Sequence, residues 1–126
     1  MLTTDPNDPG LRKIRLDGQQ EKYVVLSEEE RSKGFVRPFR DRYIHLECGA
    51  KTTMGLALSE TYARNPKFYG GTFCCGCGTH FPLRTPVGWN FEWMDGEPVG
   101  STEEEASEYK AEKIRLENDK NRGAGI

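Results

Sequence analysis

The stretch FCCGCGTHF, residues 73–81, holds three of the chain's four cysteines, and the fourth lies in HLECGA, residues 45–50. Both stretches contain the same pattern, which is a potential metal ligand, two residues, a cysteine and a glycine. Two residues between ligands allow a tight turn to direct both side chains at one ion, and a glycine accepts the left-handed backbone of such a turn. The two stretches therefore predict one tetrahedral site built from two turns that are distant in sequence.

The spacing also predicts which residues bind the ion. We expect a single structural zinc ion, Zn²⁺, held by His45, Cys48, Cys74 and Cys77. His80 follows Cys77 by three residues and is the alternative to His45, or a hydrogen-bond donor behind the site. Cys75 stands between two ligands, and adjacent cysteines cannot easily both face one ion. We therefore expect Cys75 to be a small, partly buried residue outside the ligand set.

Other cysteine chemistries fit this pattern less well. A redox Cys-x-x-Cys motif normally opens a helix, whereas Gly78, Pro82 and Pro86 oppose a helix after the second turn. Disulfides are typical of secreted proteins, and residues 1–10 show neither the basic segment nor the apolar run of a secretion signal. A catalytic zinc would keep one position for water, and a rubredoxin-like iron site usually has four cysteines.

Length and composition predict one compact domain with a small core. Of 126 residues, 35% are hydrophobic and 30% are charged, so a metal staple would contribute much to stability. The sequence contains no run of 18 apolar residues, so it predicts no membrane-spanning helix. We expect a cytoplasmic protein. The predicted fold is α+β, with a small zinc-ribbon-like β core, a short helix between the two turns and a C-terminal helix.

The chain divides by its local patterns into three parts. Residues 1–36 predict a hairpin, with strands at 11–16 and 21–26, and a short helix that Ser27 caps and Gly34 ends. Residues 37–100 predict the zinc-ribbon core, with a strand at 42–46, a helix at 53–65 and a strand and turn within 89–100. Residues 101–126 predict an acidic helix capped by Ser101 or Thr102, with a frayed tail from residue 121.

Charge is distributed unevenly along the chain. Residues 1–30 carry −3, residues 31–90 carry +6 and residues 91–126 carry −5. The basic middle segment interleaves with aromatic residues such as Phe35, Phe39, Tyr43 and Tyr62, a pattern compatible with contacts to phosphates and bases. The alternative is that the aromatic residues form the core and the cations pair with the acidic flanks. The candidate nucleic-acid-binding residues are Arg31, Lys33, Arg37, Arg40, Arg42, Arg64 and Lys67.

Two resemblances accompany these motifs. Residues 43–83, which include both ligand turns, resemble the zinc-ribbon group of small metal-binding folds. They depart from the simplest zinc-ribbon pattern in two ways, because one ligand is a histidine and a helix lies between the turns. The segments RSKGFVRPFR and TTMGLALSETYARNPKFYGGTFCCGCGTHFP, within residues 28–101, resemble small zinc-binding proteins encoded by tailed phages and prophages. That second resemblance implies a metal site and a viral protein in the host cytoplasm, and it implies no reaction.

These observations favour a binding protein over an enzyme. The first hypothesis is a zinc-stabilised protein that contacts a host or viral protein partner. The alternative is a nucleic-acid-binding zinc ribbon that uses the basic middle segment. A nuclease or other enzyme is disfavoured, because no set of nucleophile, base and orienting group is evident, even with Glu47 and Glu60 as carboxylates near the turns. We therefore predict no catalytic residue, and the sequence indicates no oligomeric state.

Overall fold

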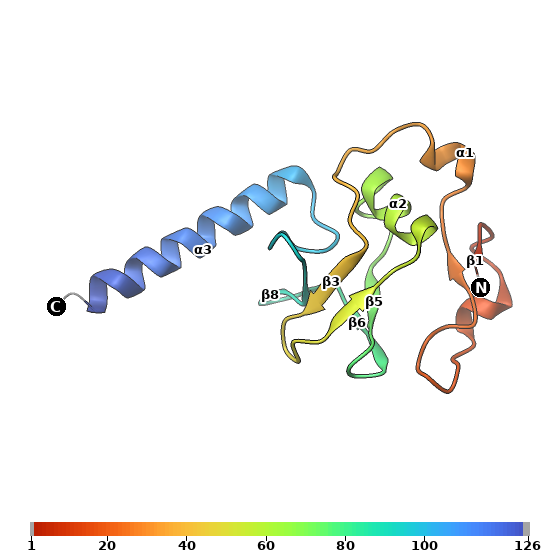
Figure 1. The fold of residues 1–126 in the computed structure, drawn as a ribbon, viewed down its shortest axis with the longest axis horizontal. Helices are drawn as coiled ribbons and strands as arrows, with labels where there is room; N and C mark the ends of the chain where they lie inside the picture. The colour runs from red at the N-terminus through yellow and green to blue at the C-terminus, as the bar shows by residue number, and fades with distance from the viewer. Residues whose placement is uncertain (1, 125–126) are drawn as a thin grey trace.

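The computed structural model describes residues 2–124, with side chains as far as Asp119, and has the predicted α+β fold (Figure 1). The N-terminal segment holds β1 (Leu2–Thr3), a 3₁₀ helix η1 (Pro9–Arg12), β2 (Tyr23–Val24) and α1 (Glu28–Arg31). The middle of the chain holds β3 (Arg42–His45), β4 (Lys51–Thr53), α2 (Leu56–Arg64), β5 (Gly71–Cys74), β6 (Thr79–Pro82), β7 (Arg84–Thr85), β8 (Gly88–Trp89) and β9 (Phe91–Trp93). The C-terminal helix is α3 (Glu103–Ala124).

Three antiparallel units make the centre of the molecule. One sheet has the order β4-β3-β9, and two separate hairpins are β5-β6 and β7-β8. Each ligand turn closes one hairpin, because the first joins β3 to β4 and the second joins β5 to β6. The two turns therefore come from different sheets.

The hydrophobic core lies directly behind the two turns. Tyr43 of β3 is 1% exposed and meets the rings of Phe91 and Trp93 edge-on, with centroids 5.4 and 6.2 Å away. Tyr62 of α2 also meets the Trp93 ring edge-on, at 5.4 Å. Cys74 is fully buried in the same cluster, so the core and the cysteine site are continuous.

Most of the hairpin predicted at residues 11–26 is not formed, so that prediction is wrong. Asp8 accepts a hydrogen bond from the Gly10 N–H, and the ring of Pro9, at the first helical position, fixes its own φ in the helical range, so residues 9–12 form η1 instead of a strand. Only one antiparallel bridge remains, between Ile14 and Gln20. The second predicted strand is short and pairs in parallel with β1.

The observed boundaries of the three α-helices differ from the predicted ones. Ser27 caps α1 as predicted by accepting from the Glu30 N–H, although the helix lasts only one turn. The helix predicted from residue 53 begins at Leu56, because Lys51–Thr53 pair with β3 and their threonines favour a strand. Residues 121–124, expected to be a tail, continue α3, and the rest of that predicted tail lies outside the described residues.

Helix α3 starts against the body and then leaves it. Thr102 and Glu105 form a reciprocal capping box, with distances of 3.0 and 3.2 Å. Figure 1 shows the helix projecting away from the sheets, with its far end on the opposite side of the molecule from β1. Its 22 residues are rich in charge, and within residues 2–124 we find no helix long and apolar enough to cross a membrane.

Candidate metal centre

The two turns have matching backbone geometry. Each begins at the last residue of a strand, His45 of β3 and Cys74 of β5. The Gly49 N–H donates to the His45 carbonyl at 2.7 Å, and the Gly78 N–H donates to the Cys74 carbonyl at 2.8 Å. Both glycines are left-handed, with φ of +77° and +68°. The repeated pattern in the sequence therefore corresponds to a repeated structure, in which glycine is needed for its backbone conformation.

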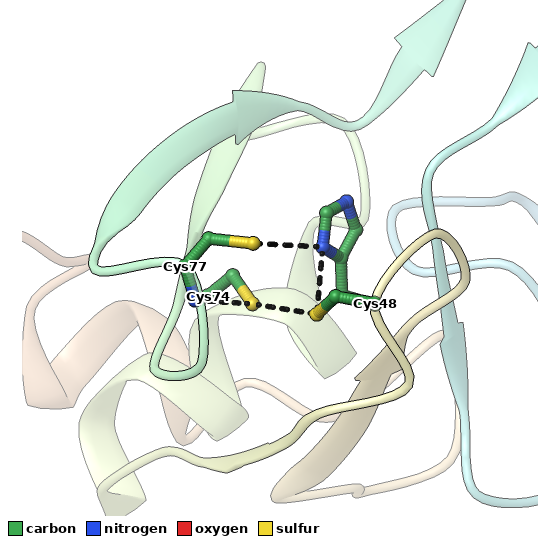
Figure 2. A group of neighbouring side chains, drawn as sticks. Cys48, Cys74 and Cys77 are labelled. Atoms are coloured by element: carbon green, nitrogen blue, oxygen red, sulfur yellow. Dashed lines mark hydrogen bonds between the residues drawn. The ribbon is translucent and has the colours of Figure 1, made fainter.

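The turns bring one histidine and three cysteines together. The possible ligand atoms of His45, Cys48, Cys74 and Cys77 all lie within 4.8 Å of one another, close enough to hold a metal ion. The His45 Nδ1 is 3.2 Å from the Cys48 sulfur and 3.7 Å from the Cys77 sulfur, and the Cys48 and Cys74 sulfurs are 3.4 Å apart. Figure 2 shows the sulfurs directed at one another and at the imidazole ring.

Two phenyl rings hold the His45 imidazole. Phe81 of β6 and Phe91 of β9 stack on it, at centroid distances of 4.5 and 4.8 Å and interplanar angles near 30°. The side chain is nearly inaccessible, and Nε2 is buried with no hydrogen-bond partner among the described residues. A neutral imidazole with its proton on Nε2 directs the Nδ1 lone pair at the sulfurs, which is the form that binds a cation. In metal sites, a hydrogen bond from the other ring nitrogen usually fixes the orientation of a histidine ligand. Here the stacked phenyl rings fix the orientation of the His45 ring.

The cysteine environment favours a bound cation. A hydrogen bond from the Ala50 N–H to its sulfur lowers the pKa of Cys48. Local desolvation, with hydrogen bonds to the Cys48 and Cys74 sulfurs, raises the pKa of Cys77 to about 12. Three sulfurs this close cannot all be thiolates without a compensating positive charge. A metal ion supplies that charge, and binding it would release protons to solvent.

Two glycines allow the surroundings of the site to pack closely. A Cβ at Gly76 would lie 2.5 Å from the Ala50 Cβ, so the first and second turns touch there without space for a further carbon. A Cβ at Gly18 would lie 1.8 Å from the Gly78 carbonyl oxygen, which places the N-terminal turn directly on the second ligand turn. The candidate metal site is thus packed against the N-terminal segment.

Cys75 and His80 lie apart from the four-residue cluster. Cys75 is exposed rather than partly buried as expected, because residue 75 is at the outside of the turn, where its S–H donates to the Lys51 carbonyl at 3.1 Å. The His80 Nε2 lies 3.0 Å from the Tyr23 hydroxyl, and its ring packs near Phe73. Burial lowers the pKa of His80, so the neutral ring is favoured. His80 therefore fastens the N-terminal segment to β6 and does not contact the cysteines.

Most of the basic candidates are paired within the protein. Arg37 and Arg40 both contact Glu97, and their side chains are only 8% and 11% exposed. Arg31 pairs with Glu60, which is not among the four residues of the cluster. The remaining pairs are Lys33–Glu30, Arg64–Glu30 and Lys67–Glu105. Arg42 alone among the seven candidates has no carboxylate partner in the described structure.

The aromatic residues of the basic segment divide into two groups. Tyr43 and Tyr62 belong to the core, whereas Phe35 and Phe39 are each 45% exposed. The sequence reasoning did not identify Phe81 and Phe91 as the residues that hold His45. Their strand positions were visible, but nothing in the sequence placed β6 and β9 beside the same imidazole ring.

Comparisons of the chain with protein-family models, with curated proteins and with solved structures give no match. The inference of function therefore depends on the geometry of this site and on the charges around it.

Proposed function

We propose that the cluster binds one zinc ion and that the protein is a zinc-stabilised, protein-binding module. A tetrahedral zinc with ordinary bond lengths separates two sulfurs by about 3.8 Å and a sulfur and a nitrogen by about 3.6 Å. The two nitrogen–sulfur separations of 3.2 and 3.7 Å lie on either side of the second value, and the sulfur–sulfur separation of 3.4 Å is shorter than the first. Three thiolates and one imidazole are a common ligand set for zinc.

The site supports a structural role for the ion. Four protein ligands complete a tetrahedron, which leaves no position for a water or a substrate. His45 and Cys74 are buried in the core, so the ion would join the β3-β4 hairpin to the β5-β6 hairpin. Two ligand turns on antiparallel hairpins, with β9 as an added strand, support a zinc-ribbon-like core. Binding energy at such a site becomes folding energy.

We favour a protein partner because the basic residues of the middle segment form ion pairs within the chain. Six of its seven candidate cations contact carboxylates of the same chain, through Glu30, Glu60, Asp95, Glu97 and Glu105. Releasing Arg37 or Arg40 to a phosphate would break a largely buried ion pair. A protein partner, from a host cell or a virus, is therefore favoured over nucleic acid.

Helix α3 is the element best placed to contact that partner. Ile114 and Leu116 are 59% and 55% exposed on the part that projects from the body. The last ion pair between the described side chains of α3 and the body is Lys113–Glu92. Residues two positions apart do not share a helix face, so Ile114 and Leu116 expose apolar side chains on two different faces of the projecting part.

A binding experiment with matched variants tests this function. Immobilised zinc-loaded protein is exposed to bacterial lysate, and retained proteins are identified by mass spectrometry and titrated as purified proteins. Ile114→Glu with Leu116→Glu should abolish retention of a specific partner, whereas Val87→Glu, at a 96% exposed apolar site elsewhere, should not. Salt-sensitive binding of an oligonucleotide in place of a protein would overturn the proposal.

A further inference from the structure

A cavity of about 250 Å³ lies beside the core, away from the metal cluster. Three parts of the chain surround it. Thr52 and Thr53 of β4 and Thr72 and Phe73 of β5 form one side, Leu58 and Tyr62 of α2 form another, and Leu2 and Tyr23 of the N-terminal segment form the third. The two strands meet near the ligand turns, where the Cys75 N–H donates to the Thr52 hydroxyl at 3.1 Å. The cavity lies further along them.

The lining is aromatic and carries no charge. Tyr23, Tyr43, Tyr62, Tyr69 and Phe73 all contribute to it, and no acidic, basic or histidine side chain does. This is unusual for a chain in which 30% of residues are charged. An ionic ligand would have no counter-charge here, so charged metabolites are excluded by the cost of desolvation.

Most of the polar atoms at the cavity are already bonded to protein. The Tyr43 hydroxyl donates to the Phe73 carbonyl and lies 2.9 Å from the Thr72 hydroxyl. The Tyr69 hydroxyl donates to the Val24 carbonyl at 2.6 Å, and Tyr23 pairs with His80. These tyrosines therefore present ring carbons to the cavity. The exposed lining residues, Leu2, Thr53 and Gly55, mark its open side, where the Thr53 hydroxyl has no hydrogen-bond partner among the described residues.

We propose that this cavity binds a small neutral ring compound, an aromatic or heteroaromatic molecule of one or two fused rings with a polar group at the open side. Pockets for drug-sized ligands start at about 300 Å³, so the volume suits a smaller molecule. Aromatic walls favour a flat ligand, which can make stacked or edge-on ring contacts. The absence of charge from the lining selects neutral over ionised compounds.

The metal cluster supports the cavity wall. Thr72 and Phe73 directly precede the ligand Cys74, and Tyr43 lies two residues before the ligand His45. Without the ion, β3 and β5 would no longer be joined at the ends that carry these residues. Ring binding should therefore require the zinc-loaded protein, but it does not depend on a protein partner.

A set of probes that share one ring system tests the proposal. Indole, indole-3-acetate and tryptamine are neutral, anionic and cationic at neutral pH, and cyclohexanol is a neutral compound without an aromatic ring. Each is titrated into full-length, zinc-loaded, ¹⁵N-labelled protein and followed by two-dimensional NMR. We expect saturable shifts with indole at the amides of Leu58, Thr72 and Phe73. Binding of the other three probes should be weaker by about tenfold or more, because charge or ring contacts are lost.

Two variant pairs locate the binding. Leu58→Trp introduces an indole at a lining position, whereas Leu56→Trp introduces it at a 65% exposed position of the same helix. Gly55→Phe and Gly70→Phe form the second pair, since neither glycine has a neighbour within 4 Å of its Cβ position and only Gly55 lines the cavity. Indole affinity should fall about tenfold or more in Leu58→Trp or Gly55→Phe and stay unchanged in the controls.

Several results would overturn the inference. These are an absence of saturable shifts with indole, equal binding of the charged probes, or unchanged indole affinity in both cavity variants. Binding only of peptides with an aromatic residue would instead make the cavity part of a protein contact. A failed search for a protein partner leaves this test unaffected, because it uses purified protein and small probes alone.

Discussion

Gly76 of the second ligand turn lies against Ala50, which follows the first, and leaves no room for another carbon between them. A Cβ at position 76 would lie 2.5 Å from the Ala50 Cβ and within 3.8 Å of the Cys48 and Cys74 sulfurs. The contact sets how closely the two hairpins approach. It therefore also sets the size of the space between the four ligand atoms.

Gly76→Ala should weaken zinc binding without removing a ligand. The added methyl group has to push the turns apart, and overpacking of this kind costs about 1–3 kcal/mol. We expect a lower zinc affinity in competition with a chromophoric chelator and a lower melting temperature of the zinc-loaded protein. Gly70→Ala is the control, because its Cβ would meet nothing within 4 Å. An unchanged affinity in Gly76→Ala would show that the turns do not need this contact.

Neighbouring cysteines should respond in opposite ways to the same substitution. Cys74→Ser removes a fully buried sulfur from the cluster, so we expect loss of stoichiometric zinc and of cooperative unfolding. Cys75→Ser keeps a donor for the Lys51 carbonyl at an exposed position, so zinc content and unfolding should match the parent protein. Elemental analysis and circular dichroism measure both. A parent protein that folds normally in strong chelator would contradict the zinc assignment.

Substitution of each histidine should distinguish a zinc ligand, His45, from a residue that holds the N-terminal segment in place, His80. His45→Ala removes a ring that stacks on Phe81 and Phe91 and is one of four ligands, so zinc should be lost. His80→Ala removes the contact with Tyr23, so zinc should remain at one per chain while amides of the N-terminal segment exchange faster with solvent. Full zinc content in His45→Ala, with loss in His80→Ala, would reverse the assignment.

The sequence was sufficient for the parts of the structure that depend on short-range chemistry. Ligand spacing with a following glycine predicted two matching turns, and the Ser27 and Thr102 caps predicted helix starts, because each feature needs only a few adjacent residues. The class of fold followed from the same local patterns.

Features that depend on distant contacts were not predictable from the sequence. The start of α2 moved because β4 pairs with β3, and the second strand of the predicted hairpin pairs with β1 instead of with residues 11–16. The stacking of Phe81 and Phe91 on His45 requires three strands to meet. Charge counting likewise showed a basic segment but could not show that Glu97 neutralises Arg37 and Arg40.

Glu97 should contribute to stability as an ionised group. Desolvation opposes its charge, but hydrogen bonds from Lys110 and Arg40 and the charges of Arg40 and Arg37 together lower the pKa of Glu97 to about 2. The unfolded pKa is near 4.5, so this contribution is complete above about pH 4.5 and is lost as pH falls toward 2. The difference corresponds to about 3 kcal/mol at neutral pH.

Glu97→Gln should therefore lower the free energy of unfolding at pH 7 by about 2–3 kcal/mol, measured by urea titration of zinc-loaded protein. Glu112→Gln is the control, because its ion pair with Arg115 is exposed on both sides and should contribute nothing measurable. The carboxyl carbon of Glu97, followed by NMR, should titrate well below pH 4. A midpoint near 4.5 would show that the arginine pairs do not form in solution.

The two halves of α3 should differ in local stability. Tyr109 and Lys113 both bind Glu92, and Lys110 binds Glu97, so the first half is fixed to β9 and its following turn. The described side chains from Arg115 to Asp119 pair only within the helix, and an isolated helix of this length is marginal in water. Hydrogen exchange of the free protein should show protected amides up to about Lys113 and fast exchange beyond it. Protection of that second half should appear on binding of the partner and be absent in Ile114→Glu with Leu116→Glu. Equal protection along the whole helix in the free protein would mean that this surface is already covered, for example by a second copy of the chain, and the proposed partner site would have to lie elsewhere.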